Sequence, residues 1–260
     1  MNHNLLPARI LGLLLLFGLA AALPAEASES EARAIGQAYD LESDEFLYRE
    51  VYCTNAKPGE VEVIYRNEAD DMIARKLLDY RSGAISPSFV QQNFYSDEVI
   101  EVALREGEVT MAILDATSSE TKKSVREAAG GKIPVVIDAG FDEYVRRNWD
   151  ELMDGEKLRF RFPFADHARL IKLRIKRSAC SYETDSHQCF RLELSNWLLR
   201  MVIAPIELGY DPEKRRLLRY RGLSNIGDGK GNGSIVDIRY DYQDLPALAC
   251  RAEPTAAGQS

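Results

Sequence analysis

The sequence predicts an α+β protein: a strongly curved antiparallel sheet, or half-open barrel, of about ten strands with one main helix packed on it. Two observations predict the sheet. Short runs rich in Val, Ile and Tyr recur between turn residues, and many of them alternate apolar with charged residues, as half-buried strands do. One segment, FDEYVRRNWDELMDG, instead repeats its apolar residues at helical spacing, which predicts the helix.

The first 27 residues have the order of a secretory signal peptide. The cation Arg9 precedes an apolar run from Ile10 to Leu23, and small residues lead up to Ala27, where we expect cleavage. The apolar run is shorter than the roughly 20 residues that a membrane-spanning helix needs. We therefore expect export to the periplasm and no transmembrane segment in the mature protein.

The mature chain is acidic and large enough for one sizeable domain. We expect a flexible polar lead-in over 28–44, a single α+β domain over 45–250 and a flexible tail over 251–260. The leader removes one charge of each sign, so the net charge stays at -8. An acidic chain without a basic block is a poor binder of phosphate backbones, and nucleic acid is excluded as the expected partner.

The first half of the domain reads as hairpins, followed by a connector. The connector is the polar stretch 115–132, which ends in Gly130-Gly131. After it, KIPVVID is almost wholly apolar, as expected for a strand covered on both faces. The strand-like runs before the connector are EFLYREVYC, VEVIYR, MIARKLLDY, VIEVALR and VTMAIL.

The predicted helix has one apolar face, which includes Phe141, Val145 and Trp149. Asp138 is suited to cap its start and Gly155 to end it. Two interpretations of the apolar face remain open. It covers the sheet as ordinary core, or it forms a lid over an apolar cavity.

The second half again reads as half-buried strands, with Arg and Lys on the outward positions. This cationic face is interpreted as a solvated surface, a device against aggregation or a patch that attracts anions. The runs are KLRFRFPFA, RLIKLRIKR, CFRLEL, PIELGYD, KRRLLRYRGLSNI and SIVDIRYDY.

Four cysteines lie beyond the leader, and an oxidising compartment favours their pairing. Of the three connectivities we favour Cys180 with Cys189, because the short polar loop between them can close a hairpin, which leaves Cys53 with Cys250. A metal site at Cys180, His187 and Cys189 is the alternative, although no fourth ligand is evident.

Strong chemical motifs are missing from the sequence. Only His167 and His187 remain beyond the leader, and there is no G-x-S-x-G elbow. The glycine-rich GDGKGNG (227–233) precedes a strand-like run, which favours a hairpin tip over a phosphate or calcium loop. We therefore expect no cofactor, no metal and no assigned catalytic residue, and the sequence leans against an enzyme.

Two long segments, VVIDAGFDEYVRRNWDELMDGEKLRFRFPF and IELGYDPEKRRLLRYRGLSNI, carry a resemblance. With weaker support from LYREVY and MIARKLLDY, the chain resembles an uncharacterised family of exported bacterial proteins. The resemblance implies no activity or catalytic residue. The order of elements is also similar, at the level of fold, to periplasmic lipoprotein-carrier proteins, in which a curved sheet shelters acyl chains.

The leading functional hypothesis is a periplasmic, non-catalytic carrier of a lipid or other apolar ligand. The residues expected to line its site are Phe141, Val145, Trp149, Trp197 and Leu198. The alternative is an envelope structural or interaction protein with a filled core, whose cationic strands meet an anionic partner or membrane surface. An enzyme that uses carboxylates is a third hypothesis, which the sequence supports least.

Overall fold

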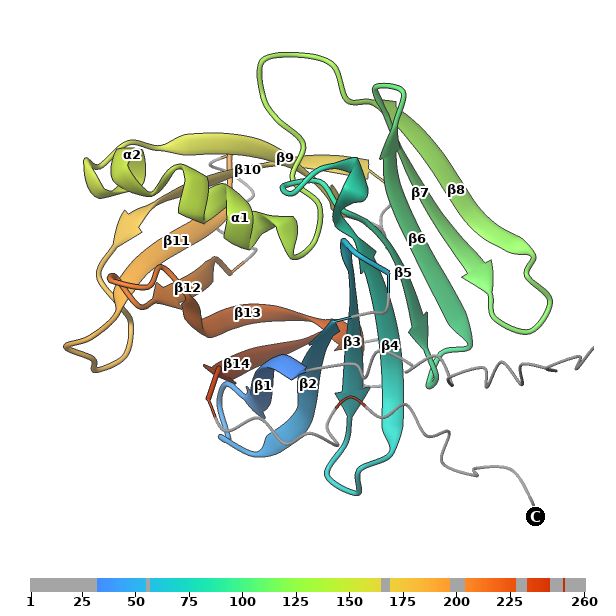
Figure 1. The fold of residues 1–260 in the computed structure, drawn as a ribbon, viewed down its shortest axis with the longest axis horizontal. Coiled ribbons are helices and arrows are strands. Elements are labelled where there is room, and N and C mark those ends of the chain that lie inside the picture. The colour runs from blue at the N-terminus through green and yellow to red at the C-terminus, as the bar shows by residue number, and fades with distance from the viewer. Residues whose placement is uncertain are drawn as a thin grey trace, which may run out of the picture.

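The computed structural model describes residues 32–54, 57–164, 169–196, 204–227, 233–243 and 250. Within these residues the chain is mostly β-structure, with two short α-helices (Figure 1). The helices are α1 (Gly140–Arg147) and α2 (Trp149–Met153), and a 3-10 turn covers Tyr80–Ser82. The strands are β1 (Ala32–Asp40), β2 (Phe46–Thr54), β3 (Glu60–Arg66), β4 (Met72–Asp79), β5 (Ser88–Asn93), β6 (Glu98–Arg105), β7 (Glu108–Asp115), β8 (Thr121–Ala128), β9 (Leu158–Phe164), β10 (Arg169–Ser178), β11 (Gln188–Leu194), β12 (Ile206–Tyr210), β13 (Leu217–Gly227) and β14 (Gly233–Asp241).

All of these strands belong to one antiparallel sheet in the order β8-β7-β6-β5-β4-β3-β2-β1-β14-β13-β12-β11-β10-β9. Strands that follow one another in the chain are neighbours in the sheet, except β8 and β9, which lie at its two edges. In addition, β1 pairs with β14, which joins the two ends of the domain. The predicted antiparallel sheet is confirmed, but it has 14 strands where the sequence predicted about ten. The sheet rolls up without closing (Figure 1).

The segment 28–44, predicted to be a flexible lead-in, instead contains β1. This strand is hydrogen-bonded along both edges and lies in the middle of the sheet order. Its inward positions are Ala34, Gly36 and Ala38, and a Cβ on Gly36 would come within 2.9 Å of three surrounding side chains. Small inward residues carry little hydrophobic signal, and for that reason the sequence pattern missed this strand.

The polar connector predicted at 115–132 contains another strand, β8, which lies at one edge of the sheet. It pairs with β7 only, and its side chains are mostly exposed, so it lacks the apolar alternation of the inner strands. KIPVVID, in contrast, is not a strand among the elements described. Its Val135, Val136 and Ile137 are buried, and one parallel bridge joins Val135 to Arg161 of β9.

The two edge strands, β8 and β9, approach each other without a hydrogen-bond ladder in the described residues. Arg161 of β9 donates to the carbonyl oxygens of Ala128, Ala129 and Ile133 near the end of β8. Leu170 of β10 packs in the same apolar cluster as Val125 of β8. Side chains and the 133–137 segment therefore hold this seam of the rolled sheet.

The single predicted helix is divided at Asn148 into α1 and α2. The Asn148 side-chain amide donates to the carbonyl oxygen of Tyr144 at 2.7 Å, while its own backbone N–H reaches that oxygen at only 3.3 Å. A side chain that competes for a helical carbonyl in this way interrupts the helix. Gly155 follows with φ of 90°, a conformation that favours glycine, and the predicted end is confirmed.

Three hairpin turns share one local design. The side-chain oxygens of Asp40, Asp115 and Asp211 each accept hydrogen bonds from the backbone N–H groups two and three residues later. A residue with positive φ closes each turn: Asp44, Ser119 and Arg215. Aspartate is favoured in such turns because its short carboxylate can bond to the nearby backbone.

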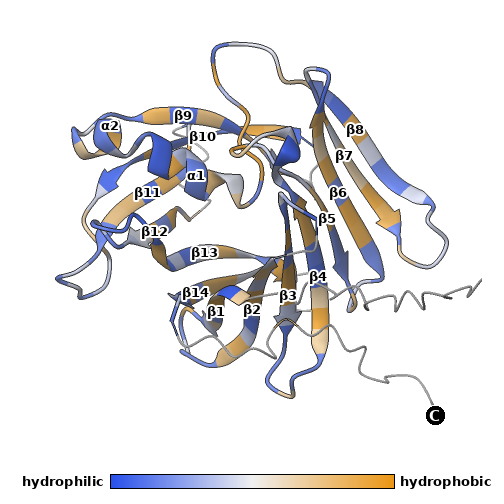
Figure 2. Ribbon diagram, viewed as in Figure 1, coloured by the Kyte–Doolittle hydropathy of each residue, from blue (hydrophilic) through white to orange (hydrophobic). Residues whose placement is uncertain are grey.

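The core consists of apolar clusters on the inward face of the rolled sheet. Hydrophobic and hydrophilic residues alternate along many of its strands (Figure 2). One cluster lies under α1 and α2, a second between β2, β3, β4 and β14, and a third near β6 and β7. Both predicted disulfides, Cys53–Cys250 and Cys180–Cys189, are present. The Cys53–Cys250 disulfide packs with Val51 on the outer face of β2 and β3.

Candidate interaction surface

The predicted apolar site lies under the helices, where the structure brings Phe141, Val145 and Trp149 into one cluster. Val145 and Trp149 are buried, and Phe141 is half-buried at the margin. The Trp149 ring packs edge-on against Phe190 at 5.1 Å and Tyr210 at 5.7 Å between ring centres. The side chains under α2 therefore pack closely against one another, as expected if this helix face covers the sheet as ordinary core. Trp197 and Leu198 lie outside the described residues.

The opposite face of the same strands is cationic. On β10, Leu173 and Ile175 point into the core, so Arg174 and Lys176 between them point outward. The alternation continues across the neighbouring strands. We define the cationic wall as Arg159, Lys172, Arg174, Lys176, Arg191, Arg219, Arg221 and Arg239, which outnumber the carboxylates among them, Glu193, Glu207 and Asp237.

Ion pairs between neighbouring strands connect most residues of the cationic wall. Arg174 Nε donates to Glu193 at 2.7 Å, and Arg219 binds Asp237 through two nitrogens, at 2.7 and 2.5 Å. Burial alone raises the pKa of Asp237, but the hydrogen bonds and charges of Arg219 and Arg239 outweigh it and hold that pKa below the ordinary value. These pairs fix the arginine side chains in place and leave part of each guanidinium exposed.

Two cations at the β9 end of the cationic wall have no carboxylate partner among the described residues. Arg159 lies opposite Arg174 in the β9–β10 ladder, and Lys172 lies opposite Arg161, so like charges face each other there. Both Arg159 and Lys172 are exposed, and neither forms an ion pair with a carboxylate within the described part of the chain. This end of the wall is the most open to an external anion.

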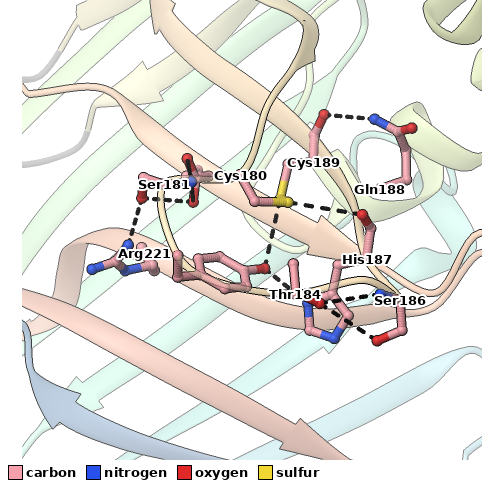
Figure 3. The surroundings of a disulfide bond; sticks show 10 residues. Cys180, Ser181, Thr184, Ser186, His187, Gln188, Cys189 and Arg221 are labelled. Atoms are coloured by element: carbon pink, nitrogen blue, oxygen red, sulfur yellow. Dashed lines mark hydrogen bonds between the residues drawn. A yellow bond between two sulfur atoms is a disulfide. The ribbon is translucent and has the colours of Figure 1, made fainter.

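The loop closed by Cys180–Cys189 folds back onto the wall (Figure 3). Its Tyr182 ring lies under the Arg219 guanidinium at 3.9 Å and over Gly209, where a Cβ would meet the tyrosine oxygen at 2.0 Å. The Tyr182 hydroxyl bonds to Nδ1 of His187 at 2.8 Å. Burial, reduced in effect by Arg219, raises the pKa of Tyr182 to about 12, so the phenol stays neutral.

The loop also anchors its neighbours. Ser181 donates through its backbone N–H and its hydroxyl to Glu207, and Arg221 in turn donates to the Ser181 oxygen at 2.5 Å (Figure 3). Desolvation, with a smaller contribution from Arg219, lowers the pKa of His187. Open hollows of about 460 and 560 Å³ flank His187 and are lined mainly by polar residues. A metal role for Cys180 and Cys189 is wrong, because both sulfurs are in the disulfide.

A group of charged residues inside the sheet was not predicted from the sequence. Glu50, Lys76 and Asp138 lie among inward tyrosines, and Lys76 and Glu50 are almost completely buried. The strand pattern does indicate the position of Glu50, which lies between Tyr48 and Tyr52 at the spacing of one strand face. Among the described residues no group of three potential ligands is placed to hold a metal ion. None of the helices described is long and apolar enough to span a bilayer.

Comparison with known proteins finds similarity to a solved structure but no matching family model. No protein-family model matches the chain, and no curated protein matches it. Among solved structures, a similar one is the β-barrel-like protein of the domain of unknown function DUF1849 from Brucella abortus. The two share 11% identity with a TM-score of 0.46, over 82% of this chain and 98% of that chain.

Proposed function

We propose that this chain is an exported, non-catalytic envelope protein that binds an anionic partner through its cationic wall. The observation that carries the proposal is the excess of cations on the outer face of β9–β14 in a chain whose net charge is -8. Such separation of charge attracts an anionic partner to one side of the molecule and repels it from the rest. Arginine suits this role because its fork of donors fits carboxylate and phosphate groups.

The carrier hypothesis has less support from the geometry. A carrier needs apolar walls around an empty volume. Here the apolar face of the helices packs against Phe160, Phe190 and Leu208, all of which are buried. Residues under α1 and α2 are therefore better assigned to stability than to ligand contact, and the exposed wall is the stronger candidate for binding.

Retention on immobilised heparin, used as a polyanion probe, tests the proposal. We expect the purified protein to be retained at low salt, and the double variant Arg159→Glu/Lys172→Glu to elute at clearly lower salt. The matched control, Lys123→Glu/Arg126→Glu, makes the same change in net charge on exposed β8. Equal loss of retention in both variants, or none in the wall variant, would remove the wall as the binding face.

A further inference from the structure

The interior of the rolled sheet contains a buried lysine in direct contact with an aspartate. Lys76 is on the inward face of β4, opposite Val63 of β3 and Gln91 of β5, and is 1% exposed. Its Nζ lies 2.7 Å from Oδ2 of Asp138, in the segment that leads into α1. The rings of Tyr65 and Phe89 cover the nitrogen at 5.9 and 5.3 Å, so the pair lies in surroundings of low polarity.

Asp138 is held in place from two sides. Its backbone has φ of 43°, a conformation that costs energy for a residue with a side chain and that recurs at functional positions. Instead of capping α1 as the sequence predicted, its Oδ1 accepts the N–H of Ala139 at 2.7 Å, and its Oδ2 faces Lys76. The carboxyl carbon is thereby presented to the lysine nitrogen in a fixed orientation.

A second carboxyl group faces the same interior. Glu50 of β2 is 2% exposed and accepts hydrogen bonds from Tyr240 at 2.6 Å and Tyr52 at 3.2 Å. Burial raises the pKa of Glu50, against smaller opposing effects of Tyr240 and Lys76, so this carboxyl takes up a proton more readily than an exposed glutamate does. A group of this kind can relay protons between reacting neighbours.

We propose that Lys76 and Asp138 form an intramolecular amide bond, a covalent cross-link between β4 and the segment that begins α1. Proton transfer within the ion pair gives a neutral amine and a carboxylic acid. The amine nitrogen attacks the carboxyl carbon, the C–OH bond breaks, and one water molecule leaves as Glu50 takes a proton from nitrogen and returns one to the departing hydroxyl. No oxidant or other co-reactant is required.

The surroundings favour this product over the ion pair. The buried ammonium of Lys76 carries a desolvation cost, and the neutral amide removes this charge together with that of its partly buried partner. Positioning replaces the activation that amide formation in water needs, because both reacting groups are fixed by the fold. The Asp138 side chain is 18% exposed, which gives the released water a path out.

Intact mass of the purified protein, reduced and denatured, tests the proposal. We expect the mass to be one water molecule lower than the mass calculated for the purified chain from its own first residue, which N-terminal sequencing identifies. Trypsin should then give a branched peptide in which residues 76–81 are joined to residues 133–146, because Lys76 is no longer a cleavage site. The full calculated mass of the purified chain, with residues 77–81 and 133–146 released as separate peptides, would overturn the proposal and leave an ordinary buried ion pair.

Variants assign the roles. Lys76→Met and Asp138→Ala should each show the full mass expected for their sequences, whereas the control Lys172→Met, on the outer wall, should keep the deficit of one water. Glu50→Gln should fold but form the cross-link more slowly, which pulse-labelled samples would show as a mass deficit that grows with time. A Glu50→Gln protein as fully cross-linked as the parent at the earliest time would contradict the relay role, and the wild-type peptide map decides the bond itself if a variant fails to fold.

Discussion

Two regions of the sheet share the alternation of inward and outward residues along their strands, but they differ in the kind of residue that faces inward. In the helix-capped region (β9–β12 with α1 and α2) the inward residues are apolar and the charges point outward. In the tyrosine region (the interior between β2, β3, β4 and β14) Tyr65, Glu50 and Lys76 point inward. Alternation along a strand therefore indicates which residues share a face, but not whether the inner face is apolar.

The two regions should therefore be stabilised differently. The helix-capped region relies on apolar burial and close packing around Trp149, which tolerates no lost volume. The tyrosine region relies on hydrogen bonds between polar side chains, such as the one between the Tyr48 and Ser224 hydroxyls at 2.8 Å, so loss of one partner should destabilise it. Substitutions that remove buried volume therefore test the helix-capped region, and substitutions that remove a single hydrogen-bonding atom test the tyrosine region.

The disulfides should contribute most to stability; one lies on the outer face of β2 and β3 behind the tyrosine region, and the other closes the loop between β10 and β11. Replacing Cys53 and Cys250 by Ser should lower the free energy of unfolding by about 5 kcal/mol on the loop-entropy model, whereas the Cys180/Cys189 double variant should cost about 3 kcal/mol. The reason is the closed loop, which spans 197 residues in the first case and 9 in the second. Urea denaturation measures both, and equal losses would contradict the entropic account.

In the helix-capped region, Trp149→Ala should lower the free energy of unfolding by about 3–5 kcal/mol, because the ring is buried and leaves a cavity. Asp150→Ala is the control, since this neighbouring side chain is 84% exposed and should cost only about 0–1 kcal/mol. A Trp149 variant as stable as the control would mean that the ring lines an open space, which is what a carrier requires.

In the tyrosine region a single oxygen should matter. Tyr240→Phe removes the donor that binds Glu50 at 2.6 Å and should cost about 1–3 kcal/mol, because the buried carboxyl loses a partner. The same deletion at exposed Tyr95 should have almost no effect. Denaturant titration of both variants checks this, and equal stability of the two would show that the network in the tyrosine region contributes nothing.

The smallest effect is a change with pH. Burial raises the pKa of Glu50 in the folded state, so the folded protein holds more protons than the unfolded chain above pH 4.5, and stability falls as pH rises from there towards the folded-state pKa. Glu50→Gln removes this loss. The difference in free energy of unfolding between variant and parent should therefore increase in the variant's favour with pH, and a difference independent of pH would refute the assignment.

Much of the fold could be predicted because local patterns agree with it. The strong alternation of β10 and the helical spacing of Val145 and Trp149 each placed the element and its buried face correctly. β1 was missed because its inward residues are Ala and Gly, and β8 because an exposed edge strand buries almost nothing. In both cases the ladder with neighbouring strands, which no local pattern reports, decides the structure.

The candidate site divides in the same way. The outward cations of β10 could be predicted from period two, and the Cys180–Cys189 bridge from its short loop. The cluster of Lys76 and Asp138 could not, because the two residues are 62 positions apart and meet only when the sheet rolls up. Charged residues at inward positions looked, in the sequence, like ordinary surface residues.

We infer that binding belongs to the outer wall and not to the interior. Native mass spectrometry of the exported protein, followed by organic extraction and lipid analysis, tests it most directly. We expect the mass of the purified chain with no bound lipid, and no uptake of added lipid. Co-purified acyl chains at near-stoichiometric amount would contradict it and return the function to an apolar carrier with Trp149 at its site.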